Sequence, residues 1–348
     1  MKHSAQQSLQ KLTDITNVIL GQDLDYMKLK ENLDDLSALF LSASKLNIDA
    51  EVNTQHLNLQ SGKAIGLKWA AMCIVDLIRT KQFISGVNKA VLDKQKSKKE
   101  GPVQILYTGT GPFATLVMPL ITRFSSEEIQ FTCLEVNPIS IQSLKNVIEA
   151  LNAAPYFRAI YECDASQFQL PDATSIDIVV IEVLQLALTR EPQVAITYNL
   201  IPQLPENVTL IPEEISLHIA LIDTKKEQEH MFAADLTKEI DYLTQLAEVF
   251  TINKEEILAR NKKANALTFS EKQIQFTKAQ LENHTSAVIL TEIHVYDSFK
   301  LGLKESGLTI PSVFADLDHE KELIGLKTQY LANNDPFLQT ILIRKSPH

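Results

Sequence analysis

The sequence predicts an α/β fold in which a mainly parallel sheet follows a helical region and precedes a β-rich module. Four short apolar runs between residues 103 and 182 alternate with helix-like segments, which is typical of parallel strands joined by helices. A turn with two glycines follows the first run, and several strand-like runs lie beyond residue 213. We therefore divide the chain into residues 1–100, 101–212 and 213–348.

Charge and cysteine content exclude several classes of partner. The 348 residues include 43 Asp and Glu against 33 Lys and Arg, and the net charge is −10. This field opposes binding to nucleic acid or to an anionic membrane, so we expect neither and favour a small or cationic substrate. The three cysteines lack metal-ligand spacing, which predicts reduced thiols, no metal site and a cytoplasmic protein. No apolar run reaches the ~18 residues of a membrane span.

The first 100 residues are predicted to be mainly helical. Apolar residues recur at helical spacing in residues 1–50, and residues 67–92 have the pattern of one long helix. Asp76 and Arg79 lie three positions apart on that helix, where a solvated ion pair is the default expectation. The charged segment 94–102 ends in Gly-Pro and is expected to be an exposed linker.

A glycine turn follows the first predicted strand, residues 103–106. It spans residues 107–113, contains Gly109 and Gly111, and precedes a predicted helix at 116–121. Strand, glycine turn and helix form a nucleotide cradle, because glycines allow close backbone approach and N–H groups at the helix start face the ligand. A pair of glycines in an ordinary tight turn is the alternative.

Acidic residues end the next three predicted strands, residues 129–134, 159–163 and 176–182. They are Glu135, Asp164 and Glu182. Open α/β sheets bind ligands at the carboxyl ends of their strands, so three acids on one rim beside a glycine turn favour a nucleoside pocket. Glu135 lies 24 residues after Gly111, where an acid can accept hydrogen bonds from ribose hydroxyls.

A second acid, Glu191, follows Glu182 by nine residues in the loop after the last of these strands. Two carboxylates on one cleft suit a flat cation, because a guanidinium presents five N–H donors in a fixed fork. We therefore expect Glu182 and Glu191 to clamp a guanidino group. The alternative is that Glu182 caps the next turn and Glu191 is solvated.

The remainder of the chain is predicted to mix helices and strands. A helix is expected at 194–204, and residues 224–282 are expected to be mainly helical. The pattern of residues 215–222 alternates between apolar and polar side chains, which predicts a half-buried strand. Further strands are predicted at residues 208–212, 286–299, 322–331 and 338–345.

Taken together, these segments resemble protein arginine methyltransferases and related class I methyltransferases that use S-adenosyl-L-methionine. Asp76 to Thr80 is similar to that family's DxxRT motif, and residues 107–113 stand where the family has its DxGxGxG turn. Glu135 matches the ribose-binding acid, and residues 182–191 match the double-glutamate loop. The resemblance covers residues of about 70–222.

This resemblance implies a Rossmann-like sheet, S-adenosyl-L-methionine as cofactor, arginine methylation and a homodimer. It assigns cofactor binding to Arg79, Tyr107, Gly109, Gly111, Glu135 and Asp164. It makes Glu182 and Glu191 the catalytic pair, which would orient a guanidinium and polarise it electrostatically. His294 and Asp297, three residues apart, are candidates for a base, with an ordinary surface or core histidine as the alternative.

The chain also departs from the family pattern. Tyr107 replaces an acid, Phe113 replaces a glycine, and the only tryptophan is Trp69. The Thr-His-Trp loop of the protein-modifying members is therefore not visible, and the C-terminal part is short for that family's barrel. These two gaps favour an acceptor such as free arginine or another small guanidino compound or peptide, whereas Tyr107 and Phe113 bear on cofactor binding. The runner-up is a methyltransferase acting on a nitrogen or oxygen of a natural product. Two further alternatives are a nicotinamide (NAD)-dependent oxidoreductase and a methyltransferase-like protein without catalytic activity.

Overall fold

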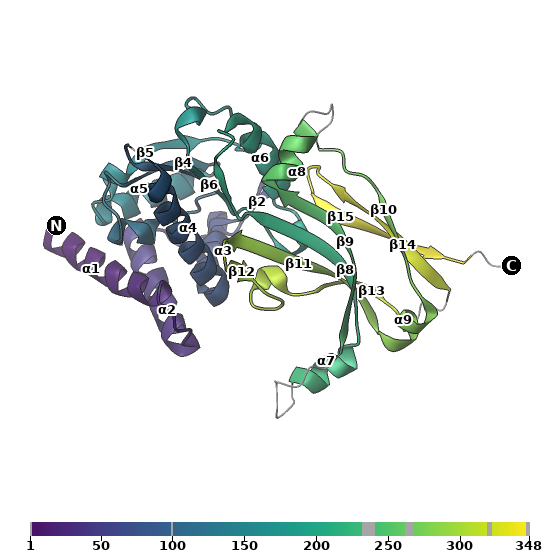
Figure 1. The fold of residues 1–348 in the computed structure, drawn as a ribbon. Helices are drawn as coiled ribbons and strands as arrows, with labels where there is room; N and C mark the ends of the chain where they lie inside the picture. The colour runs from purple at the N-terminus through teal and green to yellow at the C-terminus, as the bar shows by residue number, and fades with distance from the viewer. Residues whose placement is uncertain (1, 99, 232–240, 262–266, 319–321, 346–348) are drawn as a thin grey trace.

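The computed structural model describes residues 2–98, 100–231, 241–261, 267–318 and 322–345. The predicted succession of a helical region, an α/β sheet and an antiparallel β-rich module is confirmed, and Figure 1 shows the three parts in this order along the chain. The exact residue boundaries of the three domains stay a prediction.

The N-terminal region begins with two long helices and a short hairpin. Helix α1 (Lys2–Ile19) packs against α2 (Tyr26–Ser44), which buries an apolar stripe that includes Leu29, Leu36 and Phe40. Strands β1 (Leu57–Leu59) and β2 (Gly62–Ala64) then form an antiparallel hairpin. The hairpin leads into α3 (Leu67–Met72).

The single long helix predicted for residues 67–92 is wrong, because the chain breaks at Asp76. Helix α3 continues into a short 3₁₀ turn, and α4 (Leu77–Ser97) starts anew after it. Asp76 has an extended backbone and caps α4, since its carboxylate accepts the N–H of Arg79 at 3.3 Å. A side chain that satisfies a free N–H at a helix start stabilises the break, and apolar periodicity does not reveal it.

A parallel sheet of five described strands holds the centre of the molecule. Its strand order is β5-β4-β3-β6-β7, and every pairing is parallel. The chain runs outward from β3 through β4 and β5 and then returns to β6 on the other side of β3. This switch opens a crevice at the carboxyl ends of the central strands. The strands are β3 (Val103–Thr108), β4 (Ile129–Glu135), β5 (Phe157–Glu162), β6 (Ile178–Ile181) and β7 (Thr209–Ile211).

The helices around this sheet agree with prediction in part. Helices α5 (Pro138–Ala150) and α6 (Gln193–Leu200) are present, and α5 packs against α2. The helix predicted at 116–121 is wrong, since the glycine turn leads into turns and a 3₁₀ helix, Met118–Thr122. Pro119 would be the fourth residue of the predicted helix, beyond the start where a missing N–H is tolerated, which works against a regular α-helix there.

The C-terminal module is antiparallel. One sheet has the order β12-β11-β8-β9 with β13 also paired to β11, and a second has the order β10-β14-β15. Helix α4 contacts β11 and β12 as well as the parallel sheet, so it lies between the two halves of the molecule. The strands are β8 (Glu214–Ile222), β9 (Leu243–Asn253), β10 (Lys272–Gln275), β11 (Ser286–Tyr296), β12 (Phe299–Leu301), β13 (Ser312–Asp316), β14 (Leu323–Leu331) and β15 (Phe337–Arg344).

Two expectations for this module are corrected. The described part of residues 224–282 is not mainly helical: α7 (Thr224–Met231), α8 (Lys254–Asn261) and α9 (Lys278–Asn283) alternate with β9 and β10. The prediction for residues 232–240 and 262–266 lies outside the described residues. Strand β8 is not half-buried, because it pairs with β9 and β11 on its two sides and Ser216 and His218 are buried on its polar face.

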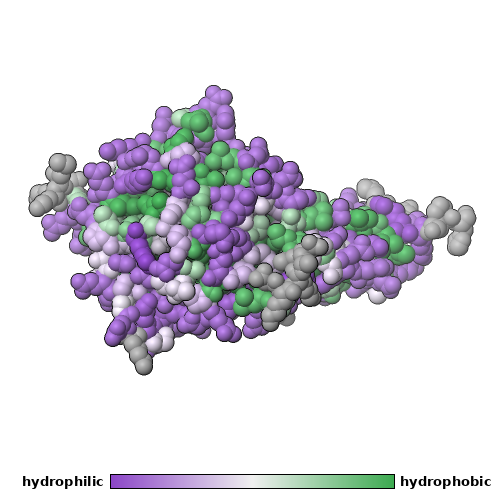
Figure 2. Space-filling model, turned by 90° about the horizontal axis from the view of Figure 1, so that it is seen from above, coloured by the Kyte–Doolittle hydropathy of each residue, from purple (hydrophilic) through white to green (hydrophobic). Residues whose placement is uncertain are grey.

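The surface is mainly hydrophilic on the face shown in Figure 2, with separate hydrophobic patches. Exposed apolar side chains include Trp69, Met72 and Val75, which follow one another at helical spacing along α3 and the 3₁₀ turn after it. Within the described ranges, every helix is too short or too polar to cross a membrane.

Candidate functional site

One cavity lies at the carboxyl ends of the central parallel strands. All eight residues predicted to bind the cofactor or the acceptor line it: Arg79, Tyr107, Gly109, Gly111, Glu135, Asp164, Glu182 and Glu191. The structure therefore brings together side chains from α4, from the ends of four strands and from the loop after β6. Their individual roles stay predictions.

The glycine turn after β3 adopts a backbone that favours glycine. Gly109 has a φ of +66° and Gly111 a φ of +58°. A Cβ on Gly109 would lie 2.4 Å from a methyl of Val183, whereas a Cβ on Gly111 would meet only Ala70 at 3.8 Å. Gly109 therefore allows two chain segments to pack closely, and Gly111 leaves space open on the cavity wall.

Glu135, at the end of β4, ties the glycine turn to the next loop. One of its oxygens accepts the N–H of Gly111, and the other accepts the N–H groups of Val136 and Asn137, each at 2.9 Å. Burial raises the pKa of Glu135, and these three backbone donors act against the rise. The carboxyl is fixed in orientation, and its oxygens still have lone pairs for a ligand hydroxyl.

Asp164 forms hydrogen bonds within the loop that follows β5. Its carboxylate accepts the N–H of Ser166 at 2.9 Å and the hydroxyl of the same residue at 2.7 Å. The neighbouring Cys163 and Ala165 also line the cavity. This wall therefore combines a polar acid with small apolar surface.

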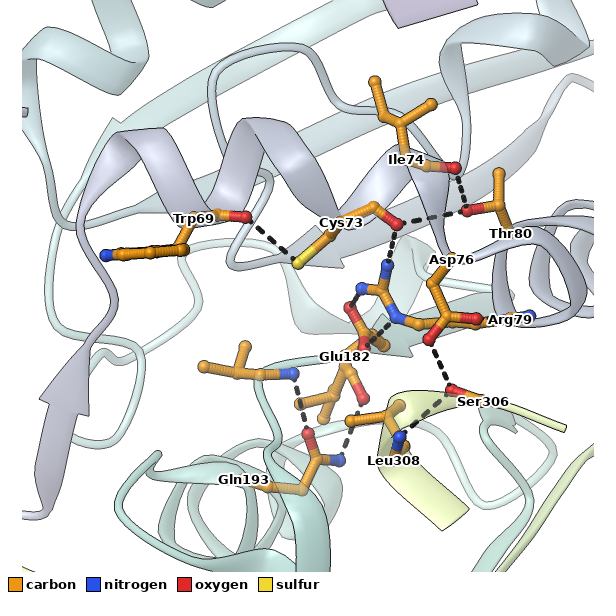
Figure 3. Close-up of polar contacts among 12 residues, drawn as sticks. Trp69, Cys73, Ile74, Asp76, Arg79, Thr80, Glu182, Gln193, Ser306 and Leu308 are labelled. Atoms are coloured by element: carbon orange, nitrogen blue, oxygen red, sulfur yellow. Dashed lines mark hydrogen bonds and ion pairs between the residues drawn. The ribbon is translucent and has the colours of Figure 1, made fainter. Parts of the chain in front are cut away.

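Arg79 and Glu182 form a buried ion pair across the floor of the cavity (Figure 3). The Nε of Arg79 donates to one carboxylate oxygen at 2.9 Å, Nη2 donates to the other, and Nη1 donates to the carbonyl of Cys73 at 3.0 Å. Burial alone would lower the pKa of Arg79, but the charge of Glu182 keeps that pKa above its ordinary value. Burial raises the pKa of Glu182, and the guanidinium opposes this rise.

Glu191 is 4% exposed and has no ion-pair partner within the described part of the chain. Burial, together with the nearby charge of Glu182, raises the pKa of Glu191 to about 8, although Arg79 and a hydrogen bond with Gln185 act in the opposite direction. The protonated form of Glu191 is therefore favoured more than in an ordinary glutamate. Binding of a cationic acceptor requires the ionised form.

Tyr107 lines the cavity close to this ion pair. It is 3% exposed, and burial raises the pKa of its hydroxyl, with the charge of Glu182 adding to the effect. The phenol is therefore neutral where the resemblance leads one to expect an acid. The neighbouring Thr108 hydroxyl is also buried and has no hydrogen-bond partner among the described residues.

The loop from Glu182 to Glu191 is held in a specific shape by other parts of the chain. Ala187, Leu188 and Arg190 have positive φ angles of 56°, 53° and 64°, which cost energy in residues other than glycine. Backbone groups of these three residues bond to Thr291, Tyr330 and Pro336 of the C-terminal module, at 3.1, 2.8 and 2.8 Å. The β-rich module therefore fixes the separation of the two glutamates.

Two residues that support the glutamates were not predicted from the sequence. Gly62 in the hairpin packs against the backbone of Glu191, and a Cβ there would lie 2.6 Å from the carbonyl oxygen of Arg190. Gln193 hydrogen-bonds to the peptide groups on both sides of Glu182. A turn glycine after a short strand could have indicated Gly62, but no sequence pattern indicates Gln193.

His294 and Asp297 lie away from the cavity. The two meet through a hydrogen bond between the ring of His294 and the backbone carbonyl of Asp297, and His294 also lies 3.4 Å from Glu213. Neither lines the cavity, so the surface alternative for His294 fits and the base alternative does not. In the ranges that the structure describes, no group of three His, Cys, Asp or Glu side chains is placed to hold a metal ion.

Comparison with known proteins leaves the family open. No family model matches the chain, and no curated protein matches it. A crystal structure of PRMT6 is 9% identical with a TM-score of 0.47, covering 75% of this chain and 95% of that one. PRMT6 with SAH is 11% identical (TM-score 0.47, coverage 75% and 96%). The Trypanosoma brucei PRMT1 enzyme–prozyme heterotetrameric complex with AdoHcy is also 11% identical (TM-score 0.47, coverage 79% and 92%). Values this low assign neither a family nor an activity.

Proposed function

We propose that the protein is an S-adenosyl-L-methionine-dependent N-methyltransferase that acts on a guanidino group of free arginine, another small molecule or a peptide. The observation that carries the proposal is the meeting of Arg79, Glu135, Glu182 and Glu191 in one cavity beside the glycine turn. One guanidinium and three carboxyl groups thereby line one cavity, which suits a cofactor that carries a carboxylate and a ribose beside a cationic acceptor.

The residues present suit this cofactor. Three of the five N–H donors of Arg79 are engaged in the described contacts, so two remain for a ligand carboxylate without loss of the ion pair. Gly111 leaves space at the cavity wall, and the buried hydroxyl of Thr108 offers an unused hydrogen-bonding group. Glu135 would hold the ribose and Asp164 the adenine side.

When bound, the cofactor supplies a methyl group on a positively charged sulfur. The chain itself contributes alignment, which is the main requirement of an in-line transfer. Glu182 and Glu191 would orient the acceptor and draw its positive charge towards the nitrogens that they contact. Because the charge of Glu182 is already balanced by Arg79, Glu191 would supply the additional negative charge that a cationic acceptor needs.

Single substitutions of the two glutamates test this role. We expect Glu182→Gln and Glu191→Gln to fall at least about a hundredfold in methyl transfer to arginine or an arginine peptide, because each removes a charge that aligns the acceptor. Glu191→Gln should bind S-adenosyl-L-methionine with nearly unchanged affinity in calorimetry. Near-normal turnover by both variants would contradict the proposal.

A second candidate is a methyltransferase that acts on a neutral nitrogen or oxygen of a natural product. It is favoured by the pairing of Glu182 with Arg79 and by the raised pKa of Glu191, since both reduce the net negative charge at the acceptor end. A neutral acceptor would receive a hydrogen bond from protonated Glu191. In this case Glu191→Gln would retain activity, because an amide donates the same bond.

A further inference from the structure

Gln193 brackets the peptide groups on both sides of Glu182. Its side-chain oxygen accepts the N–H of Val183 at 2.9 Å, and its side-chain nitrogen donates to the carbonyl of Ile181 at 2.8 Å, as Figure 3 shows. Gln193 is 2% exposed. The amide thus pairs with the chain where β6 ends, in the way that the peptide group of a neighbouring strand would.

We propose that Gln193 is a positioning residue that fixes Glu182, and with it the separation of Glu182 from Glu191. The inference rests on the proposed function, in which both carboxyls face the acceptor. Gln193 follows Glu191 by two residues and starts α6, so its two bonds close the loop between the glutamates into a ring. Without them, two buried peptide groups would lose their partners, which favours a shift of the backbone.

Gln203 provides a control for the two hydrogen bonds of Gln193 to the backbone. Gln203 accepts the N–H of Leu170 at 2.9 Å and donates to the carbonyl of Phe168 at 3.0 Å, so it also spans two peptide groups around one residue. Gln203 does not line the cavity. Replacement of either glutamine by methionine removes its bonds to two peptide groups and leaves the volume of the side chain similar. Gln203→Met also removes a bond to the carbonyl of Asn199 at 2.8 Å, so it is the more severe of the two changes.

The test compares Gln193→Met with Gln203→Met by amide hydrogen exchange and by methyl transfer. We expect faster exchange at Val183 in the first variant and at Leu170 in the second. Turnover should fall about tenfold or more only in Gln193→Met, because a small displacement of an aligning group is costly. Unchanged exchange at Val183, or equal losses of turnover in both variants, would overturn the inference.

Gln193→Glu gives a second measurement if the methionine variant does not fold. A protonated carboxyl offers the same acceptor and donor as the amide, whereas an ionised carboxyl cannot donate to Ile181. The charged groups nearby are Arg79, which stays protonated in this pH range, and Glu182 and Glu191, which also titrate in the wild-type protein, so the informative quantity is the ratio of variant to wild-type turnover at each pH. We expect this ratio to rise as the pH falls from about 8 to about 6. A ratio near one at every pH would contradict the claim that the two bonds of Gln193 position Glu182.

The two kinds of failure can be told apart. A wild-type protein that binds S-adenosyl-L-methionine but methylates no acceptor, or that binds no cofactor, would overturn the proposed function. The exchange rates at Val183 and Leu170 would still decide whether Gln193 holds the chain at Glu182, because they do not depend on turnover.

Discussion

Glu191 lies in an environment that differs strongly from that of an ordinary glutamate. Its carboxyl has a pKa of about 8 in the folded protein, against 4.5 as the ordinary value. Between these two values the folded state holds a proton that the unfolded chain has lost. Stability from this group is therefore complete below about pH 4.5, declines as the pH rises and is lost above about pH 8.

The variant Glu191→Gln cannot ionise at this position. Between about pH 5 and pH 8 its free energy of unfolding should therefore decrease less than that of the wild type, and the difference should be on the order of a few kcal/mol. Urea unfolding at several pH values measures the effect. Glu162→Gln, which changes an exposed glutamate at the end of β5, is the control; parallel pH profiles of the wild type and Glu191→Gln would show that Glu191 is not protonated in the fold.

Gly101, Gly109 and Gly111 all have a positive φ but differ in their surroundings. Alanine substitutions at the three positions therefore distinguish the effect of backbone strain from the effect of filling ligand space. Gly101 has a φ of +74°, and a Cβ there would meet no described atom within 4 Å beyond its chain neighbours. Gly101→Ala should therefore lose only about 1 kcal/mol of stability from strain. Gly109→Ala should lose more, about 2–3 kcal/mol, because of the contact with Val183.

Gly111→Ala should be as stable as Gly101→Ala but bind the cofactor more weakly, because its Cβ would project into the cavity. Calorimetric titration with S-adenosyl-L-methionine, beside urea unfolding of the three variants, measures this difference. Equal cofactor affinities of Gly101→Ala and Gly111→Ala would argue against a ligand at the glycine turn.

Residue types and positions after strands, which are local properties, indicated the two glycines and the four acids of the cavity, whereas Arg79 and Tyr107 were assigned through the family resemblance. Gln193 could not be identified, because it supports a glutamate that it meets only in the folded chain, and Gly62 was not identified although it lies in a turn. The ion pair between Arg79 and Glu182, 103 residues apart, was likewise not predicted. The pattern of α4 indicated a partner for Arg79 on the same helix, Asp76, which in the structure serves as a cap.

At the scale of elements, strands were predicted correctly where the burial of side chains determines the order of apolar and polar residues. The central strands of the parallel sheet are short, mainly apolar and buried runs, and β14 and the second half of β11 alternate between buried and more exposed side chains. Strand β9 was missed because its leucine, glutamine, alanine and glutamate residues favour helix locally, whereas long pairing with β8 determines its conformation. The break before α4 was missed because it depends on a single cap.

The cap at Asp76 has a consequence for both halves of the molecule. Besides capping α4, its carboxylate accepts the hydroxyl of Ser306 at 2.7 Å and the N–H of Gly307 at 2.9 Å. It thereby connects the start of the helix that carries Arg79 to the C-terminal module. Asp25, which accepts the N–H of Lys28 at 3.1 Å, caps α2 through its side chain without such a link in the described contacts.

We therefore expect Asp76→Ala to be more destabilising than Asp25→Ala. Loss of a cap is worth about 1 kcal/mol, and loss of the two additional bonds should bring the total for Asp76→Ala to about 3 kcal/mol. Asp76→Ala should also weaken cofactor binding, because the start of α4 moves. Chemical denaturation and calorimetry measure the two effects, and equal behaviour of both variants would refute the link.

At the scale of the whole molecule, the β-rich module shapes a site that lies on the parallel sheet. Tyr330 of β14 is 2% exposed, and its hydroxyl donates to the carbonyl of Leu188 in the loop between the glutamates. Tyr156 makes a comparable bond to the carbonyl of Phe124 at 2.9 Å, but within the α/β part. Substitution of each tyrosine therefore distinguishes the loss of a hydrogen bond between the two modules from the loss of one within a single module.

Tyr330→Phe and Tyr156→Phe should each lose about 1 kcal/mol of stability, since each loses a hydrogen bond. Only Tyr330→Phe should reduce methyl transfer, by roughly three- to tenfold, because the positive-φ loop would no longer be held in place. Thermal unfolding and steady-state kinetics of the two variants measure this. Full activity of Tyr330→Phe would mean that the loop keeps its shape without the C-terminal module.

The most direct measurement is the mass of free arginine, and of an arginine-containing peptide, after incubation with S-adenosyl-L-methionine and the wild-type protein or Glu191→Gln. We predict that the wild type adds a methyl group to at least one of these acceptors and that the variant adds none under the same conditions. An unchanged mass of both acceptors with the wild-type protein, or equal methylation by the variant, would contradict the claim that a glutamate pair holds a guanidino group beside the methyl donor.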